Sequence, residues 1–163
     1  MQPDLNSQLL VAINTLKKVV LPAVDINNKP AQEQLMLTIK TLEASCERLP
    51  YRRRYIRQQL ALTINMAEKI LGLLTELQLE LKQQLAINLA EATASYKDID
   101  ADCETLVDWD SVLMANLCQG LAACKGADNY GDIVSVLIAD SEALISLGRR
   151  WCSDNGLEVD HSL

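Results

Sequence analysis

The sequence of 163 residues contains no phenylalanine, and aromatic residues make up only 4% of it. A core must therefore be filled by aliphatic side chains, and the 49% of residues that are apolar argue against a disordered chain. No apolar run approaches the ~18 residues that span a bilayer. The start, MQPDLNSQLL, has no basic lead of the kind found in secretory signals. We expect a cytoplasmic protein that does not contact a membrane.

Other absences narrow the chemistry. Histidine occurs once, at His161, so histidine zinc sites, di-iron sites and Ser-His-Asp triads have no basis in this sequence. The glycines stand singly, and no glycine-rich phosphate loop is present. No C-x-x-C pair is found among the five cysteines, which we interpret as reduced core residues: Cys46, Cys103, Cys118, Cys124 and Cys152. We predict neither a cofactor nor a bound metal.

The longest helical signal runs over residues 51–97, which consist almost throughout of strong helix formers. One straight helix of that length would span roughly 70 Å, whereas a domain of this size has a radius of gyration of about 15 Å. The helix is therefore either broken or shared with a second copy of the chain. A break near 72–78 would use Gly72 as a C-terminal cap and Thr75 with Gln78 as a capping box.

Shorter amphipathic helices surround this central segment. Asp4 is the expected N-cap of a helix that ends near Leu21, with an apolar seam at Leu9, Ile13, Leu16 and Val20. A second helix starts near Pro30 and places Leu35, Ile39, Leu42, Cys46 and Leu49 on one face. Two further helices are expected after the central segment, from Asp102 to about Lys125 and from Gly131 to about Asn155, with Gly126 as a C-cap between them.

These signals predict an all-α fold, an antiparallel bundle of five or six helices around the central segment. We expect one domain over residues 1–156, followed by a flexible tail over 157–163. Charge is divided unevenly, because residues 1–57 carry a net +4 and residues 58–163 a net −11. Two halves of opposite sign indicate internal docking or contact between copies.

A basic cluster marks the start of the central segment. It consists of Arg48, Arg52, Arg53, Arg54 and Arg57, interleaved with Tyr51 and Tyr55. Cations are disfavoured at a helix N-terminus, so an anionic group should answer them. Three readings stay open: neutralisation by the Asp98–Asp110 stretch within the fold, a partner-binding surface, or a site for a small anionic ligand. Nucleic acid is not expected, since the chain carries a net charge of −7.

Two acidic features have alternative readings. Asp98, Asp100, Asp102 and Glu104 have the spacing of the first ligands in a calcium loop, but Cys103 and Trp109 then break the pattern, so we interpret the stretch as a capped turn. In the last helix, Asp140 interrupts an apolar seam and should point inward. Such a carboxylate must be paired, hydrogen-bonded or protonated, which leaves both a structural and an acid–base role open.

The interpretation that we favour is a non-enzymatic intracellular interaction or adaptor protein that forms a homodimer through the central segment and binds a partner protein. It predicts residual apolar surface on residues 73–89. The alternative is a ligand-binding or catalytic helical domain whose pocket holds an anion through Arg52, Arg53 or Arg57, with Asp140 inside. The sequence contains no motif that makes a positive case for an enzyme.

Overall fold

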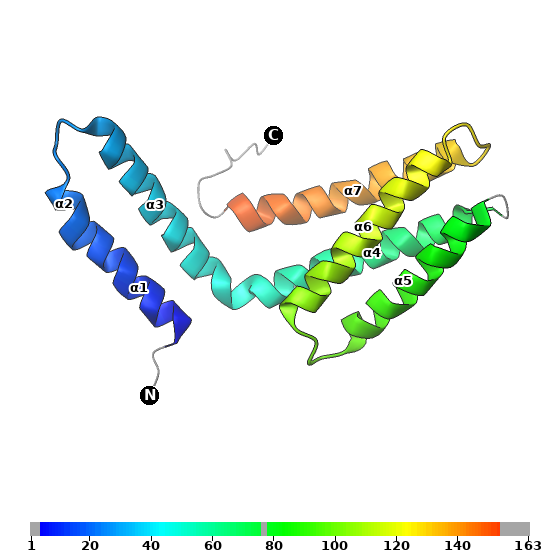
Figure 1. Ribbon diagram of the computed structural model, residues 1–163, viewed down its shortest axis with the longest axis horizontal. Helices are drawn as coiled ribbons and strands as arrows, with labels where there is room; N and C mark the ends of the chain where they lie inside the picture. The colour runs from blue at the N-terminus through cyan, green and yellow to red at the C-terminus, as the bar shows by residue number, and fades with distance from the viewer. Residues whose placement is uncertain (1–3, 76–77, 154–163) are drawn as a thin grey trace. The chain divides into compact units, whose positions relative to one another are not determined.

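The computed structural model describes residues 4–75 and 78–153. The described residues are almost entirely helical and include no strand, which confirms the all-α fold (Figure 1). Contacts divide the chain into an N-terminal unit that ends at Arg52 and a C-terminal unit that begins at Arg53. No helix in the described parts of the chain is long and apolar enough to cross a lipid bilayer. The two units are considered separately below.

The first helix of the N-terminal unit contains a π-helical turn. Helix α1 (Leu5–Thr15) begins at Asp4, whose Oδ1 accepts a hydrogen bond from the Ser7 amide at 3.0 Å, so the expected N-cap is confirmed. The π turn η1 (Leu16–Val20) and the short α2 (Leu21–Ala23) continue it. Pro22 lacks an amide hydrogen, and its ring would clash with a carbonyl one turn earlier in a regular α-helix. The wider turn before Pro22 avoids that clash.

The π turn corrects one part of the expected seam. Val20 was assigned to the seam but is 37% exposed, and Leu21 packs on the core in its place. The extra residue in the π turn rotates the following side chains backward, which moves the apolar position from 20 to 21. A four-three rhythm read from sequence alone assumes 3.6 residues per turn throughout, and that assumption fails here.

Helix α3 (Lys29–Arg48) forms an antiparallel hairpin with α1, and we call this unit the N-terminal hairpin. Asn28 caps α3, and Pro30 lies in its first turn, as the sequence indicated. The hairpin core consists of three buried side chains with partly buried leucines around them: Ile13, Ile39 and Cys46, with Leu9, Leu16, Leu21, Leu35 and Leu42. The 3₁₀ turn η2 (Leu49–Tyr51) contains Pro50 and ends this segment.

The central segment is broken where expected, but not by the predicted glycine cap. Helix α4 (Arg52–Leu73) ends before Thr75, and α5 (Leu79–Lys97) begins after Gln78. Gly72 lies inside α4, and the only glycine with positive φ in the described residues is Gly126, so the cap assignment to Gly72 was wrong. Gln78 Oε1 accepts hydrogen bonds from the Thr75 amide and hydroxyl, both at 2.9 Å, which is one half of the predicted capping box. The other half is absent from the described residues, because the Gln78 amide donates to the Thr75 main-chain carbonyl and Gln78 itself is the N-cap of α5.

Helices α4 and α5 pack with α6 (Cys103–Ala123) and α7 (Tyr130–Ser153) into one unit, which we call the C-terminal bundle (Figure 1). Its interior is aliphatic, as the lack of phenylalanine requires. The fully buried large side chains of the bundle include Leu60, Met66, Ile70, Leu85, Leu106, Leu113, Leu117 and Ile133. The apolar pattern of residues 51–97 also assigns Leu77 to this core, but Leu77 lies outside the described residues.

The caps of the later helices follow the sequence signals closely. Asp102 Oδ1 accepts a hydrogen bond from the Thr105 amide at 2.7 Å and caps α6. Gly126, which follows α6, has a φ of 90°. Glycine adopts a positive φ at no steric cost, which is why it is preferred just after a helix. The predicted end of α7 near Asn155 and the tail over 157–163 lie outside the described residues. A single domain over 1–156 stays a prediction, which a fragment experiment below addresses.

Candidate functional site

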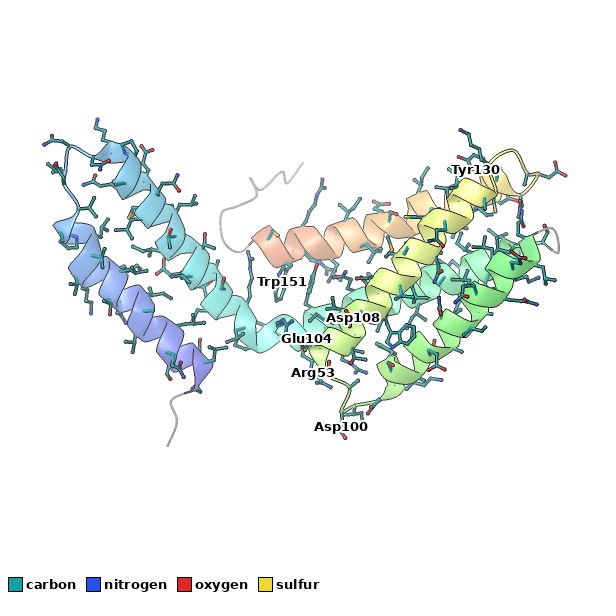
Figure 2. All side chains as sticks on the ribbon, in the orientation of Figure 1. Arg53, Asp100, Glu104, Asp108, Tyr130 and Trp151 are labelled. Atoms are coloured by element: carbon teal, nitrogen blue, oxygen red, sulfur yellow. The ribbon has the colours of Figure 1, made fainter. Side chains whose placement is uncertain are left out.

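The arginines at the start of α4 contact the end of α5. Arg57 donates from Nη1 to the Asp98 carbonyl at 3.2 Å and from Nη2 to the Tyr96 carbonyl, and its guanidinium lies 4.8 Å from the centre of the Tyr96 ring. Arg53 donates from Nη2 to the Ile99 carbonyl. Figure 2 shows Arg53 beside the loop that carries Asp100. Arg57 thus satisfies carbonyls of the last turn and C-cap of α5, where the helix dipole is negative, whereas Arg53 binds a carbonyl of the loop just after the helix.

The acidic stretch also contributes its charge to this contact. A hydrogen bond from the Thr105 amide is the main cause that lowers the pKa of Asp102 below its ordinary value, and the positive charge of Arg53 lowers it further. The structure therefore places the Asp98–Asp110 stretch against two of the arginines, with its main-chain carbonyls as the direct hydrogen-bond partners. An anion or partner site at these arginines stays a prediction.

The remaining members of the basic cluster lie elsewhere. Arg48, Tyr51 and Arg52 belong to the end of the N-terminal unit, whereas Tyr55 belongs to the C-terminal bundle. Tyr55 stacks on Trp151 of α7 with ring centroids 4.4 Å apart and planes at 27°. The residues of the basic cluster are thus divided between the two units.

Asp140 is half-buried and forms an ion pair with a lysine of α4. Lys69 Nζ lies 2.7 Å from Oδ1 and 2.9 Å from Oδ2 of Asp140, and the Asp140 side chain is 17% exposed. The sequence left three ways to accommodate this carboxylate, and the structure shows a paired one. Two asparagines whose helical positions also suggested polar groups near the core differ in burial: Asn65 is exposed, whereas Asn116 is buried with no partner for Nδ2 among the described residues.

The most deeply buried carboxylate is one that the sequence reading did not single out. Asp110 on α6 is only 8% exposed. Its Oδ1 accepts a hydrogen bond from Thr63 Oγ1 and its Oδ2 one from Gln59 Nε2, each at 2.6 Å. A sequence signal for it does exist, because Leu106, Asp110, Leu113 and Leu117 follow the four-three rhythm. Asp110 was instead counted with the exposed acids that precede it.

Asp110 borders a cavity of about 240 Å³ within the C-terminal bundle. The cavity lies among α4, α6 and α7 and is lined by Tyr55, Gln59, Thr63, Asp110, Met114 and Leu144. The lining combines polar groups with apolar side chains. Pockets that bind small molecules commonly have such a mixed lining, in which a few polar groups fix the orientation of an otherwise apolar ligand.

Tyr55 supplies the aromatic wall of this cavity. Burial is the main cause that raises the pKa of its phenol above the ordinary value, and the anionic forms of Cys152 and Asp110 raise it further. The phenol therefore stays protonated at neutral pH and acts as a hydrogen-bond donor or acceptor. No group of three metal-binding side chains is found in residues 4–75 and 78–153.

Comparisons with known proteins identify no relative of this chain. No family model matches it, and neither a curated protein nor a solved structure shows significant similarity. Function must therefore be argued from the contacts and surfaces described above.

Proposed function

We propose that the chain is a non-enzymatic helical interaction protein that self-associates through one side of its N-terminal hairpin. The observation that carries the proposal is the distribution of charge on either flank of the hairpin core. One flank bears no charged residue on either helix, and the other bears four: Lys17, Lys40, Glu43 and Glu47.

The two flanks follow from the register of the core residues. Positions one residue before the core seam are uncharged on both helices: Gln8, Ala12 and Thr15 on α1, and Gln34, Thr38, Thr41 and Ser45 on α3. All seven are exposed. Positions one residue after the seam are mostly charged or polar: Leu10, Asn14 and Lys17, and Met36, Lys40, Glu43 and Glu47.

An ion pair shows that the charged flanks lie together. Lys17, next to α1 in η1, pairs with Glu43 of α3 across the hairpin. Since the helices are right-handed and antiparallel, equal rotations away from the core bring both flanks to the same side. The uncharged flanks must then share the opposite side, which we call the uncharged side.

The hydroxyl groups of the uncharged side are already satisfied by their own helices. Each donates to the carbonyl four residues earlier at 2.8–2.9 Å: Thr15 to Val11, Thr38 to Gln34, Thr41 to Leu37, and Ser45 to Thr41. A polar group that is hydrogen-bonded in this way can leave water at little cost. The small side chains also allow another helix to approach closely.

The hairpin core needs another helical layer packed against it. Among the described residues of the hairpin only four are buried, Ile13, Ile39, Ala44 and Cys46, and its leucines are partly exposed. Leu9 lies four residues before Ile13, and Leu16 lies three residues after it. Helical geometry therefore turns both leucines toward the uncharged side relative to Ile13. A layer packed on that side would therefore cover the leucines as well as the threonines, and two-layer packing is the usual way in which a helical surface is buried.

A second copy of the same hairpin suits this side. The N-terminal unit carries six Lys and Arg against five Asp and Glu, a net charge of only +1, and the uncharged side brings no like charges together. Helix α3 has 20 residues. Two such helices, about 30 Å long and about 10 Å apart, offer roughly 600 Å² per copy, or roughly 1,200 Å² in total. That area is at the lower end of what stable dimers bury.

The test is the mass of the protein in solution, measured by sedimentation equilibrium and native mass spectrometry. We expect a dimer for the unmodified chain and a monomer for Ala12→Glu, because each copy would bury the new charge near that of its partner. Leu10→Glu is the matched control, since it puts the same charge at an exposed position of α1 on the opposite flank. It should remain dimeric.

Two results would contradict the proposal. One is a monomer at micromolar concentration for the unmodified chain. The other is an equal response of the two variants. If the chain is monomeric and Ala12→Glu lowers the unfolding midpoint much more than Leu10→Glu does, the uncharged side is covered within one chain, and self-association through it is wrong.

A further inference from the structure

We infer that the cavity beside Asp110 binds a small organic molecule that carries a primary ammonium group on an apolar body. This site lies within the C-terminal bundle and is independent of the hairpin dimer proposed above. It rests on three features: the charge of Asp110, which has no ion pair among the described residues, the mixed polar and apolar lining of the cavity, and the absence of a metal-binding cluster in the described residues.

The charge of Asp110 lacks a cationic partner. Its two hydrogen-bond donors, Gln59 and Thr63, are both neutral, and among the described residues Asp110 forms no ion pair. Lys69, on the same helix as those donors, is paired with Asp140 instead. A buried carboxylate is costly unless a positive charge accompanies it, so the site favours a cation.

The geometry fixes the carboxylate in position for that cation. Thr63 is fully buried, and Gln59 holds the other oxygen, so neither oxygen is free to rotate. An ionised carboxylate has about four acceptor positions, and these two bonds use only half of them. The phenol oxygen of Tyr55 adds one acceptor. A primary ammonium has three N–H donors, which the remaining acceptors can satisfy.

The rest of the lining suits an apolar body. Met114 and Leu144 form an aliphatic wall, and the ring of Tyr55, held by its stacking on Trp151, offers a face that attracts cations. The cavity of about 240 Å³ is larger than the engineered cavity of about 150 Å³ that accommodates benzene. A molecule of the size of benzylamine is therefore an appropriate probe.

Two other ligand classes fit less well. Calcium and magnesium need about six oxygen ligands, whereas a single carboxylate lines this cavity and no metal-binding cluster occurs in the described residues. An anion would be repelled by Asp110, and Arg53 and Arg57, which could hold one, do not line the cavity but donate to carbonyls at the end of α5. The charge of the cavity thus selects a cation of organic size.

The test compares a cation with its neutral isostere by isothermal titration calorimetry at pH 7. Benzylammonium and benzyl alcohol have nearly the same shape, but only the former is charged. We expect benzylammonium to bind at least about tenfold more tightly, because a hydrogen bond to an ionised partner is worth more than a neutral one. A capped lysine, with acetyl and methylamide ends, represents a partner protein's side chain and should bind more weakly than benzylammonium.

Variants locate the site. Asp110→Asn keeps an acceptor for the Thr63 hydroxyl but removes the charge, and it should abolish the preference for the amine. Asp108→Asn is the matched control: it removes one charge from an exposed position of the same helix and should bind benzylammonium as the unmodified chain does (Figure 2).

Several outcomes would overturn the inference. They are equal affinity of the unmodified chain for the amine and the alcohol, no binding of the amine up to about 10 mM, and unchanged amine binding by Asp110→Asn. Tighter binding of the capped lysine would assign the site to a protein side chain rather than a small molecule. The comparison of amine with alcohol needs no variant, so it decides the matter even if Asp110→Asn does not fold.

Discussion

At the scale of single residues, this chain depends on aliphatic side chains that are entirely buried. Leu60 of α4 and Leu113 of α6 both show no exposed area. No aromatic side chain is among the largest fully buried side chains of the described residues, so aliphatic residues such as these two fill the core. Protein interiors are packed so closely that the loss of one large side chain leaves a cavity which the surroundings fill only in part. The stability of the C-terminal bundle should therefore be sensitive to single truncations.

We expect Leu60→Ala to lower the free energy of unfolding by about 2–5 kcal/mol, through lost burial and the cavity left behind. Urea denaturation followed by circular dichroism would measure it. Leu79→Ala is the matched control, because Leu79 is 46% exposed and its truncation removes little buried surface. A loss for Leu60→Ala no larger than for Leu79→Ala would show that α4 is not the centre of the core.

At the scale of elements, each helix end has an identifiable cause. Asp4, Asn28 and Asp102 accept main-chain hydrogen bonds at the starts of α1, α3 and α6. The end of α5 is different, because Arg53 and Arg57 from another helix supply its donors. A local cap is formed by residues that are neighbours in the sequence. The arginines instead lie 39 or more positions from the carbonyls that they bind, so this cap forms only when α4 packs against the end of α5.

The cap of α6 predicts a pH dependence. The pKa of Asp102 is lowered in the folded chain, chiefly by the Thr105 amide, so the stabilisation by its charge is present above its ordinary pKa of 3.8 and is lost as pH falls through the folded value. We expect Asp102→Asn to melt about 1–3 °C lower than the unmodified chain at pH 7, with the difference shrinking below pH 3.8 and vanishing once the pH is below the lowered pKa of the folded chain.

Asp108→Asn serves again as the control, since Asp108 is exposed on the same helix and caps nothing. Differential scanning calorimetry from pH 2.5 to 7 would measure both variants. A difference between Asp102→Asn and the unmodified chain that stays constant with pH would mean that the charge of Asp102 contributes nothing to the cap.

At the scale of the whole molecule, the two units differ in how much core they contain. The C-terminal bundle has a buried cluster that extends from Ile56 to Ile133, whereas the buried cluster of the N-terminal hairpin contains only three side chains. A helical pair with so small a core lacks the apolar burial needed to offset the conformational entropy lost on folding. The bundle should fold by itself, and the hairpin should need a neighbour.

We predict that a fragment over residues 52–163 unfolds cooperatively, with a melting temperature within about 5 °C of that of the full chain. A fragment over residues 1–51 should be largely unfolded at low micromolar concentration and gain helicity as its concentration rises, because dimerisation completes its core. Circular dichroism would follow both. Noncooperative melting of the larger fragment would instead support one domain over residues 1–156.

Much of the local structure could be predicted because it is set by neighbours in the chain. The helical periodicity, the caps at Asp4 and Asp102, the glycine turn at Gly126 and the interruption near 72–78 all follow from residues within a few positions of each other. The same local reasoning failed at Val20, because the π turn before Pro22 changes the number of residues per turn, and at Gly72, which the helix incorporates without positive φ.

The sequence by itself therefore determined the helical class, most helix boundaries and the apolar seams. Only the tertiary structure decided the partners of the charged residues: Lys69 for Asp140, main-chain carbonyls at and just after the end of α5 for Arg53 and Arg57, and two neutral donors for Asp110. Helix formation depends on contacts three or four residues apart, which a sequence displays directly. Charge pairing depends on which helix faces which and at what rotation, and that is fixed only when the bundle packs.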